Sequence, residues 1–136
     1  MNKIKQLVKG LVQKHGTNDP WDLCEKLKVI VLVADLPTNI HGFYHCINKQ
    51  QIIHISRWIS NSQMKMVCAH ELGHVILHGH RNMYTVEHTA TLEQEAEEFK
   101  FWLLNLRGLS TEFPTFDPVE IAQFANLPPE ALILDF

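Results

Sequence analysis

The spacing of hydrophobic and polar residues predicts that the chain begins with two helices. Residues 3–15 carry apolar side chains at helical spacing between lysines, which is typical of an amphipathic helix, and Gly16 ends it. Asp19 and Pro20 form the pair expected of an N-cap followed by proline in the first helical turn. A second helix is therefore predicted to run from there to Leu27.

Three short segments with extended character follow these helices. Residues 29–33 are a β-branched run suited to a buried strand, and residues 41–47 and 51–56 are two further strand candidates. Residues 48–50 separate the last two and predict a hairpin turn. The middle of the chain is therefore expected to form a small three-stranded sheet.

The second half of the chain returns to helical patterns. One long helix is predicted from about residue 60 to 78, with Gly79 as its stop signal, and another from about residue 91 to 107. Proline-led segments within residues 117–136 predict two short helical pieces. Because helices precede and follow the sheet, the predicted fold class is α+β, with residues 1–136 as a single domain that includes this tail.

Composition and charge narrow the classes of protein that fit this pattern. The 136 residues are 46% hydrophobic and 20% charged, and the net charge of −3 gives no electrostatic reason to expect nucleic-acid binding. Cys24, Cys46 and Cys68 form no CxxC pair, which argues for reduced thiols rather than disulfides. No apolar run approaches membrane-spanning length, and the N-terminus lacks a secretory apolar region. A cytoplasmic protein with no membrane partner is therefore expected.

The helix predicted at residues 60–78 contains the sequence His-Glu-Leu-Gly-His at residues 70–74. Two histidines four residues apart lie on one face of a helix, so both imidazoles can reach one metal ion. Glu71 between them points towards the open coordination position, where a carboxylate can take a proton from bound water. This arrangement predicts that His70 and His74 are metal ligands and that Glu71 is a catalytic base.

A catalytic zinc site usually has a third protein ligand, and His80 is the nearer candidate. It follows His74 by six residues, which is the spacing of the metzincins, whose third histidine comes after a helix-breaking glycine. Here the equivalent position is Leu77 and the glycine comes only at Gly79, so the helix is expected to continue past the required turn. The sequence therefore argues against His80.

The second candidate is a glutamate of the helix predicted at residues 91–107. The apolar residues of this helix cluster on one stripe, which is expected to be buried: Leu92, Ala96, Phe99, Leu103 and Leu106. Glu95 lies about 60° from the centre of that stripe. Glu93, Glu97 and Glu98 lie about 100° to 140° away, as expected of a solvated face. An unpaired inward carboxylate would be costly, so Glu95 is predicted to be the third ligand.

The motif at residues 70–74 is followed by Leu77-His78 and then by Glu95-Ala96. This combination resembles the ImmA/IrrE family of zinc-dependent metallopeptidases. The resemblance implies a zincin-like domain, in which the small sheet packs against the motif helix and further helices. It also implies that Zn²⁺ is held by the two motif histidines and Glu95.

The candidate catalytic groups follow from this arrangement. Zinc lowers the pKa of its bound water, and Glu71 would act on that water as the general base. The developing oxyanion needs a further donor, for which Tyr84, His88 and Tyr44 are candidates that spacing does not separate. His78, one turn after the second motif histidine, is a candidate for contact with the metal ligands or for capping the end of the helix.

The resemblance implies a zinc metalloendopeptidase that cleaves a regulatory protein at a specific site, such as a repressor of a phage or mobile element. Its partner would be a protein or peptide substrate, and neither direct nucleic-acid binding nor membrane association is expected. One alternative is a zinc-stabilised module that regulates a bound protein without catalytic turnover, and another is a chance motif in a metal-free helical protein. The glutamate at position 71 favours the enzyme, because a purely structural zinc site needs no base there.

Overall fold

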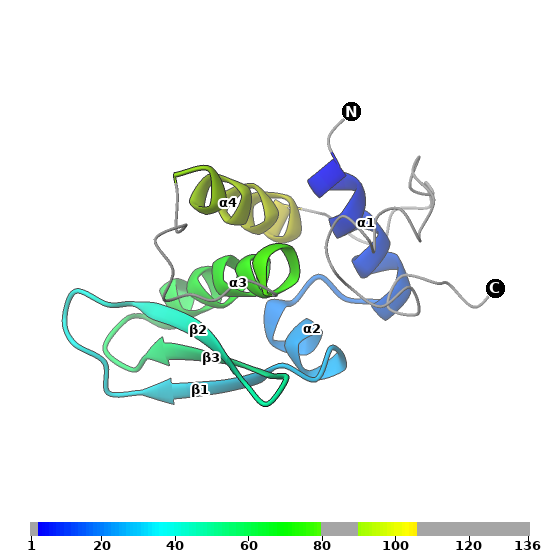
Figure 1. Cartoon of the computed structure of the whole chain (residues 1–136). Helices are drawn as coiled ribbons and strands as arrows, with labels where there is room; N and C mark the ends of the chain where they lie inside the picture. Colours follow the sequence, from blue (N-terminus) through cyan, green and yellow to red (C-terminus); the bar gives the residue numbers. More distant parts are fainter. Residues whose placement is uncertain (1–2, 80–89, 106–136) are drawn as a thin grey trace.

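The computed structural model describes residues 3–79 and 90–105, which form four helices and three strands. In chain order these are α1 (Lys3–His15), α2 (Pro20–Lys26), β1 (Ile30–Ala34), β2 (Gly42–Ile47), β3 (Gln50–Ser56), α3 (Asn61–His78) and α4 (Ala90–Asn105). The order of helices, sheet and helices confirms the α+β prediction (Figure 1). Some predictions fall outside the described residues, namely the tail helices at 117–136 and the candidates His80, Tyr84 and His88. Among the described helices, none combines the length and the hydropathy that a membrane span requires.

The three strands form one mixed sheet in the order β1-β3-β2. β3 pairs in parallel with β1 and antiparallel with β2. Asn48 and Lys49 join β2 to β3, and their φ angles of 50° and 68° are typical of the two-residue hairpin turns that match the twist of the strands. The hairpin predicted at residues 48–50 is therefore confirmed, although Gln50 already pairs with Ile47 in the ladder.

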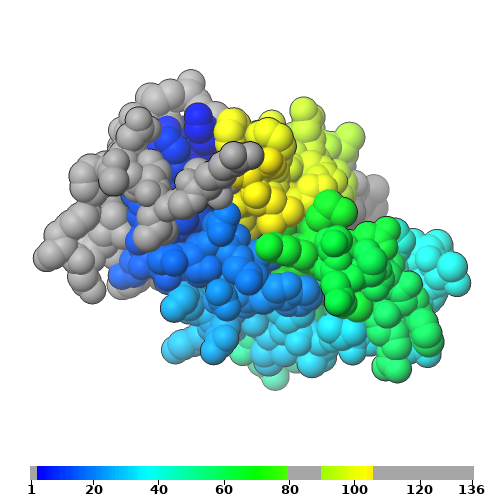
Figure 2. Space-filling view, turned by 180° about the vertical axis from the view of Figure 1, so that it is seen from behind, coloured from blue at the N-terminus to red at the C-terminus, as the bar shows by residue number. Residues whose placement is uncertain are grey.

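α3 lies between the sheet and α4, so the described part of the chain has three layers (Figure 1). Ile53 and Ile55 of β3 are completely buried in the core that the sheet shares with α3. Phe99 and Leu103 of α4 join the same core from the other side of α3. Seen from behind, α4 lies against α1 as well as α3 (Figure 2). The helix that carries the histidine motif is therefore held on two opposite sides.

Gly73, inside the histidine motif, lets α3 and α4 approach each other closely. A Cβ atom at this position would lie 3.0 Å from Cβ of Phe99 and 3.2 Å from the carbonyl oxygen of Ala96. Both distances are shorter than ordinary van der Waals contacts, so a larger side chain would push the two helices apart. The glycine thus brings the acidic side chains of α4 within reach of the histidines.

The start of α3 is fixed by local hydrogen bonds. The backbone N–H of Gln63 donates to the hydroxyl of Ser60 at 3.2 Å, and the backbone N–H of Ser60 donates to the side-chain oxygen of Gln63 at 3.0 Å. This reciprocal capping box satisfies two donors at the helix start. The predicted start near residue 60 is confirmed.

Candidate metal centre

α3 presents His70 and His74 on one face, as the spacing of the motif predicts, and Glu93 of α4 reaches across to both. Nε2 of His70 lies 3.0 Å from Oε2 of Glu93, and Nε2 of His74 lies 3.1 Å from Oε1 of the same carboxylate. One ligand atom from each of the three residues falls within 4.8 Å of the other two. The three side chains therefore converge on one point.

The chemistry and spacing of this group fit a divalent metal ion such as zinc. Two imidazole nitrogens and one carboxylate form a common ligand set of catalytic zinc sites, which leave a further position for water. Ligands of a tetrahedral zinc site lie about 3.3 Å from one another. The two nitrogen–oxygen distances of 3.0 and 3.1 Å are close to that value. His70, His74 and Glu93 could thus hold the ion.

The structure does not bring Glu95 to the histidine pair, contrary to the expectation from helical phase. Oε1 of Glu95 instead lies 3.2 Å from Nε2 of His78. The buried stripe of α4 is centred on the packing contact with α3 at Gly73, whereas the Nε2 atoms of His70 and His74 lie beside that contact. A glutamate about 100° from the centre of the stripe therefore lies on the flank that faces these nitrogens, and its side chain is long enough to reach both histidines. Glu93 occupies that position.

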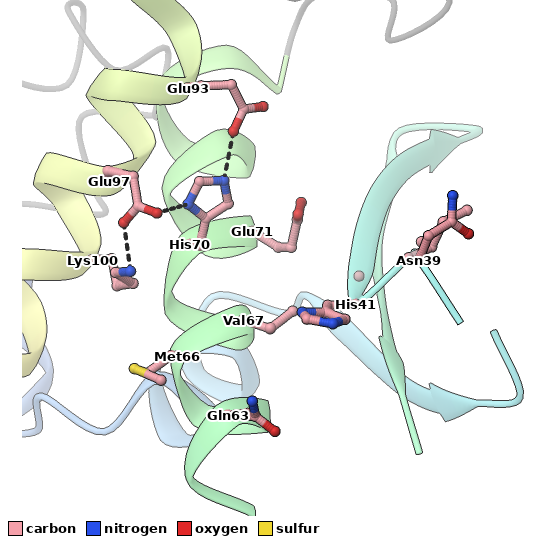
Figure 3. Close-up of a pocket in the computed structure, with 12 residues that line it drawn as sticks. Asn39, His41, Gln63, Met66, Val67, His70, Glu71, Glu93, Glu97 and Lys100 are labelled. Atoms are coloured by element: carbon pink, nitrogen blue, oxygen red, sulfur yellow. Dashed lines mark hydrogen bonds and ion pairs between the residues drawn. The ribbon is translucent and has the colours of Figure 1, made fainter. Parts of the chain in front are cut away.

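Glu71, the predicted base, is buried and lines a cavity of about 610 Å³. The cavity lies between α3, α4 and the segment that leads into β2, which contributes Asn39 and His41 (Figure 3). Burial and the nearby negative charge of Glu93 raise the pKa of Glu71 to about 8. A carboxylate whose pKa lies near neutrality is suited to proton transfer at physiological pH.

Gly42 places the start of β2 directly against this part of α3. A Cβ atom there would lie 2.5 Å from Cγ1 of Val67 and 2.9 Å from the carbonyl oxygen of His54. The same position is 3.7 Å from Cγ of Glu71. Because any larger residue would require the strand or the helix to shift, Gly42 keeps the cavity wall close to the base.

Tyr44 and His78 pack against His74, and neither is among the residues that line the cavity. The rings of Tyr44 and His74 stack with their centroids 5.6 Å apart, and the Tyr44 hydroxyl donates to the carbonyl oxygen of His78 at 3.3 Å. Nδ1 of His78 lies 3.0 Å from Nδ1 of His74. His78 is therefore a buried neighbour of the candidate ligand, which is one of the two roles that the sequence allows.

The second ring nitrogen of His70, Nδ1, has Glu97 as its neighbour. This nitrogen lies 3.6 Å from Oε1 of Glu97, and the other oxygen of Glu97 pairs with Lys100 (Figure 3). The helical phase of α4 predicts a solvated face for both Glu93 and Glu97. The signal that could have found them is their spacing, since residues 93, 97 and 100 follow one flank of the helix at intervals of four and three.

An α+β fold with two histidines of an HExxH helix and a glutamate from the next helix defines a metal-site protein of the HExxH class. Residues 24–133 match the family model described as the IrrE N-terminal-like domain, a peptidase family. The chain therefore belongs to the ImmA/IrrE family of metallopeptidases, as the motif predicted.

Two relatives illustrate this membership. The chain is 31% identical over 135 residues to the Metallopeptidase ImmA of Bacillus subtilis (strain 168). The aligned segment covers 92% of this chain and 79% of the relative. It is 33% identical over 79 residues to the Uncharacterized immunity region protein 2 of Bacillus phage phi105. This aligned segment covers 58% of this chain and 50% of that protein. The matched segment thus spans about half the length of the phage relative. No solved structure gives a significant match.

Proposed function

We propose that this chain is a zinc-dependent endopeptidase whose metal is held by His70, His74 and Glu93. The observation that carries the proposal is the position of Glu71, a buried carboxylate that adjoins the candidate ligands and lines the cavity. A structural zinc site is closed by its ligands and has no use for a base of this kind. When bound, zinc supplies Lewis acidity towards a water molecule and a scissile carbonyl group.

Glu71 is the proton carrier in this proposal. It takes the proton of the attacking water and passes it to the amine that leaves when the peptide bond breaks. Its desolvated surroundings hold its pKa at about 8, and a cation bound beside it would bring that pKa down. The carboxylate would then be ionised at neutral pH while remaining a strong enough base.

The proposed substrate is an extended segment of a protein. β2 is an edge strand of the sheet among the described residues, and the segment before it borders the cavity. A peptide that pairs with such an edge gains main-chain hydrogen bonds beside the base. Because one relative is named a metallopeptidase and another an immunity region protein, we propose a repressor of a phage or mobile element as the substrate.

The test uses the zinc-loaded protein with repressor proteins encoded in the same phage or mobile element, and compares the wild type with Glu71→Gln. We expect cleavage at one site by the wild type and a decrease of about 10²- to 10⁴-fold in Glu71→Gln, since general base catalysis contributes about that much. Zinc content measured on the same samples should be equal.

Glu98→Gln is the matched control, because it makes the same substitution at a residue of α4 that does not line the cavity. It should cleave at the wild-type rate. Equal cleavage by the wild type and Glu71→Gln would reject the assigned base. Repressor binding by the zinc-loaded wild type without any cleavage would reject the enzyme in favour of a binding module.

A further inference from the structure

His78 connects a metal ligand to a second acidic residue of α4. Its Nδ1 lies 3.0 Å from Nδ1 of His74, and its Nε2 lies 3.2 Å from Oε1 of Glu95. Both histidine side chains are nearly inaccessible, at 2% and 4% exposure, whereas that of Glu95 is 33% exposed. The three residues form a chain that runs from the metal centre to the protein surface.

The carboxylate of Glu95 determines which ring nitrogens of His78 and His74 carry a hydrogen. An ionised carboxylate only accepts hydrogen bonds, so Nε2 of His78 must carry the hydrogen that points to Glu95. In a neutral His78, Nδ1 is then an acceptor, and Nδ1 of His74 must be the donor to it. With a metal ion held between His74 and Glu93, this order would leave the lone pair of Nε2 of His74 directed at the ion.

We infer that Glu95 and His78 are positioning residues that fix the tautomer and the ring orientation of His74 for zinc binding. The inference rests on the proposed zinc site and adds two residues to it. Partners of this kind make a ligating imidazole more basic and hold its orientation. Without Glu95, His78 could equally donate from Nδ1, and His74 would then carry its hydrogen on the nitrogen needed for the metal.

The corresponding contact of His70 is weaker. Oε1 of Glu97 is 3.6 Å from Nδ1 of His70, beyond normal hydrogen-bond length, and the Glu97 side chain is 54% exposed and also paired with Lys100. The buried chain behind His74 therefore has the stronger influence on zinc affinity. This explains why an inward-facing glutamate is present on α4 in addition to the candidate ligand Glu93.

The experiment measures the zinc dissociation constant of the full chain by competition with a chelator, without any substrate. We expect Glu95→Leu to weaken zinc binding by about 10- to 100-fold, the range for loss of an outer partner of a zinc ligand. Glu95→Gln keeps an oxygen acceptor and should stay within about threefold of the wild type. Glu98→Leu, the matched control on the same helix, should bind as the wild type does.

A second variant, His78→Phe, keeps an aromatic ring at this position but removes both nitrogens, and should weaken zinc binding as Glu95→Leu does. Circular dichroism and thermal melting of the metal-free proteins establish that each variant is folded, and Glu95→Leu alone decides if His78→Phe does not fold. Wild-type affinity in folded Glu95→Leu would overturn the inference. Equal weakening by Glu95→Gln and Glu95→Leu would also overturn it. Because no cleavage is measured, a zinc-binding protein that cleaves no repressor would reject only the proposed function.

Discussion

The two histidines of the motif lie one turn apart on α3, yet their surroundings differ in exposure and in the way each ring is held. One side of the site is a buried wall, which consists of Glu71, His74, His78 and Tyr44. The other side is an open rim, which consists of His70, Glu93, Glu97 and Lys100. Exposure of the histidine side chain is 2% for His74 and 18% for His70.

The difference in exposure determines how strongly each side of the site acts on its neighbours. Inside the buried wall, hydrogen bonds and charges act in a low dielectric medium, so each partner has a large effect on its neighbours and an unpaired group is costly. At the open rim, water and salt screen the same kinds of contact. We therefore expect the buried wall to fix the orientation of His74 and the pKa of Glu71. We expect the open rim to adjust to the bound metal and the substrate.

The largest effect should come from Glu93, the candidate ligand that α4 contributes to the rim. We expect Glu93→Ala to raise the zinc dissociation constant by more than about 100-fold, because loss of a ligand exceeds the 10- to 100-fold effect of an outer partner. Glu95→Ala should stay within that outer-partner range. Zinc stoichiometry after dialysis and chelator competition distinguish the two. Retention of zinc by Glu93→Ala together with its loss from Glu95→Ala would make Glu95 the ligand.

The next effect concerns Glu71 in the buried wall of the metal-free protein. The pKa of about 8 in the folded state is higher than the value of about 4.3 in an unfolded chain, so the folded state holds this proton more tightly. The stabilising contribution of the protonated group is complete below pH ~4.3 and is lost as the pH rises to about 8.

Glu71→Gln carries no ionisable group there, so its stability relative to the wild type should increase over this pH range. We expect a gain of about 2 kcal/mol at pH 9 and none at pH 4, since one pKa unit corresponds to about 1.4 kcal/mol and partial hydration reduces the total. Urea unfolding in the presence of a chelator measures this difference. A difference that is constant with pH would mean that Glu71 is not desolvated in the fold.

A smaller effect is expected from packing between β2 and α3. Gly42→Ala would place a Cβ atom 2.9 Å from a backbone oxygen of His54 and even closer to Val67, so the strand must move. We expect a decrease of about 1–2 kcal/mol in the free energy of unfolding, as in other overpacked sites. Thermal unfolding of the metal-free protein measures it. An unchanged melting temperature would show that this side of the cavity is looser than the structure indicates.

The smallest effect should come from the charged pair at the open rim. Lys100→Met removes the partner of Glu97, and we expect a change in stability of about 0.5 kcal/mol or less, because exposed ion pairs contribute little. Glu97→Gln should change zinc affinity by less than about threefold, and the change should vanish at high salt. Measurements of both at two salt concentrations would sharpen the comparison. A salt-independent, tenfold loss of affinity would place Glu97 among the strong partners.

Local patterns predicted most of the described fold. The lysine-flanked amphipathic helix, the Asp19-Pro20 helix start, the hairpin at residues 48–50 and the long motif helix all depend on nearest neighbours along the chain. The strand predicted at 29–33 is displaced by one residue, which is normal for strand ends. The prediction that it is buried is wrong, because β1 lies at one edge of the described sheet and Ile30, Leu32 and Val33 are exposed. The family also followed from the motif, because its residues lie close together in the sequence.

The choice between Glu93 and Glu95 depends on tertiary packing and could not be predicted from local patterns. Helical phase gives the angle of each side chain relative to the buried stripe of its own helix. It does not show on which flank of that stripe the neighbouring helix presents its ligands. Glu95 is nearer to the stripe, but it lies on the flank of His78, whereas Glu93 lies on the flank of the Nε2 atoms of His70 and His74.

The sequence by itself determined that two histidines share one helical face with a glutamate between them, because a spacing of four residues is a property of any α-helix. It also determined the fold class and the family. Only the tertiary structure decided which glutamate meets the histidines, that His78 is buried between His74 and Glu95, and that burial raises the pKa of Glu71. These features depend on how closely α4 and the sheet pack against α3, and Gly73 and Gly42 permit that packing through contacts with residues distant in the chain.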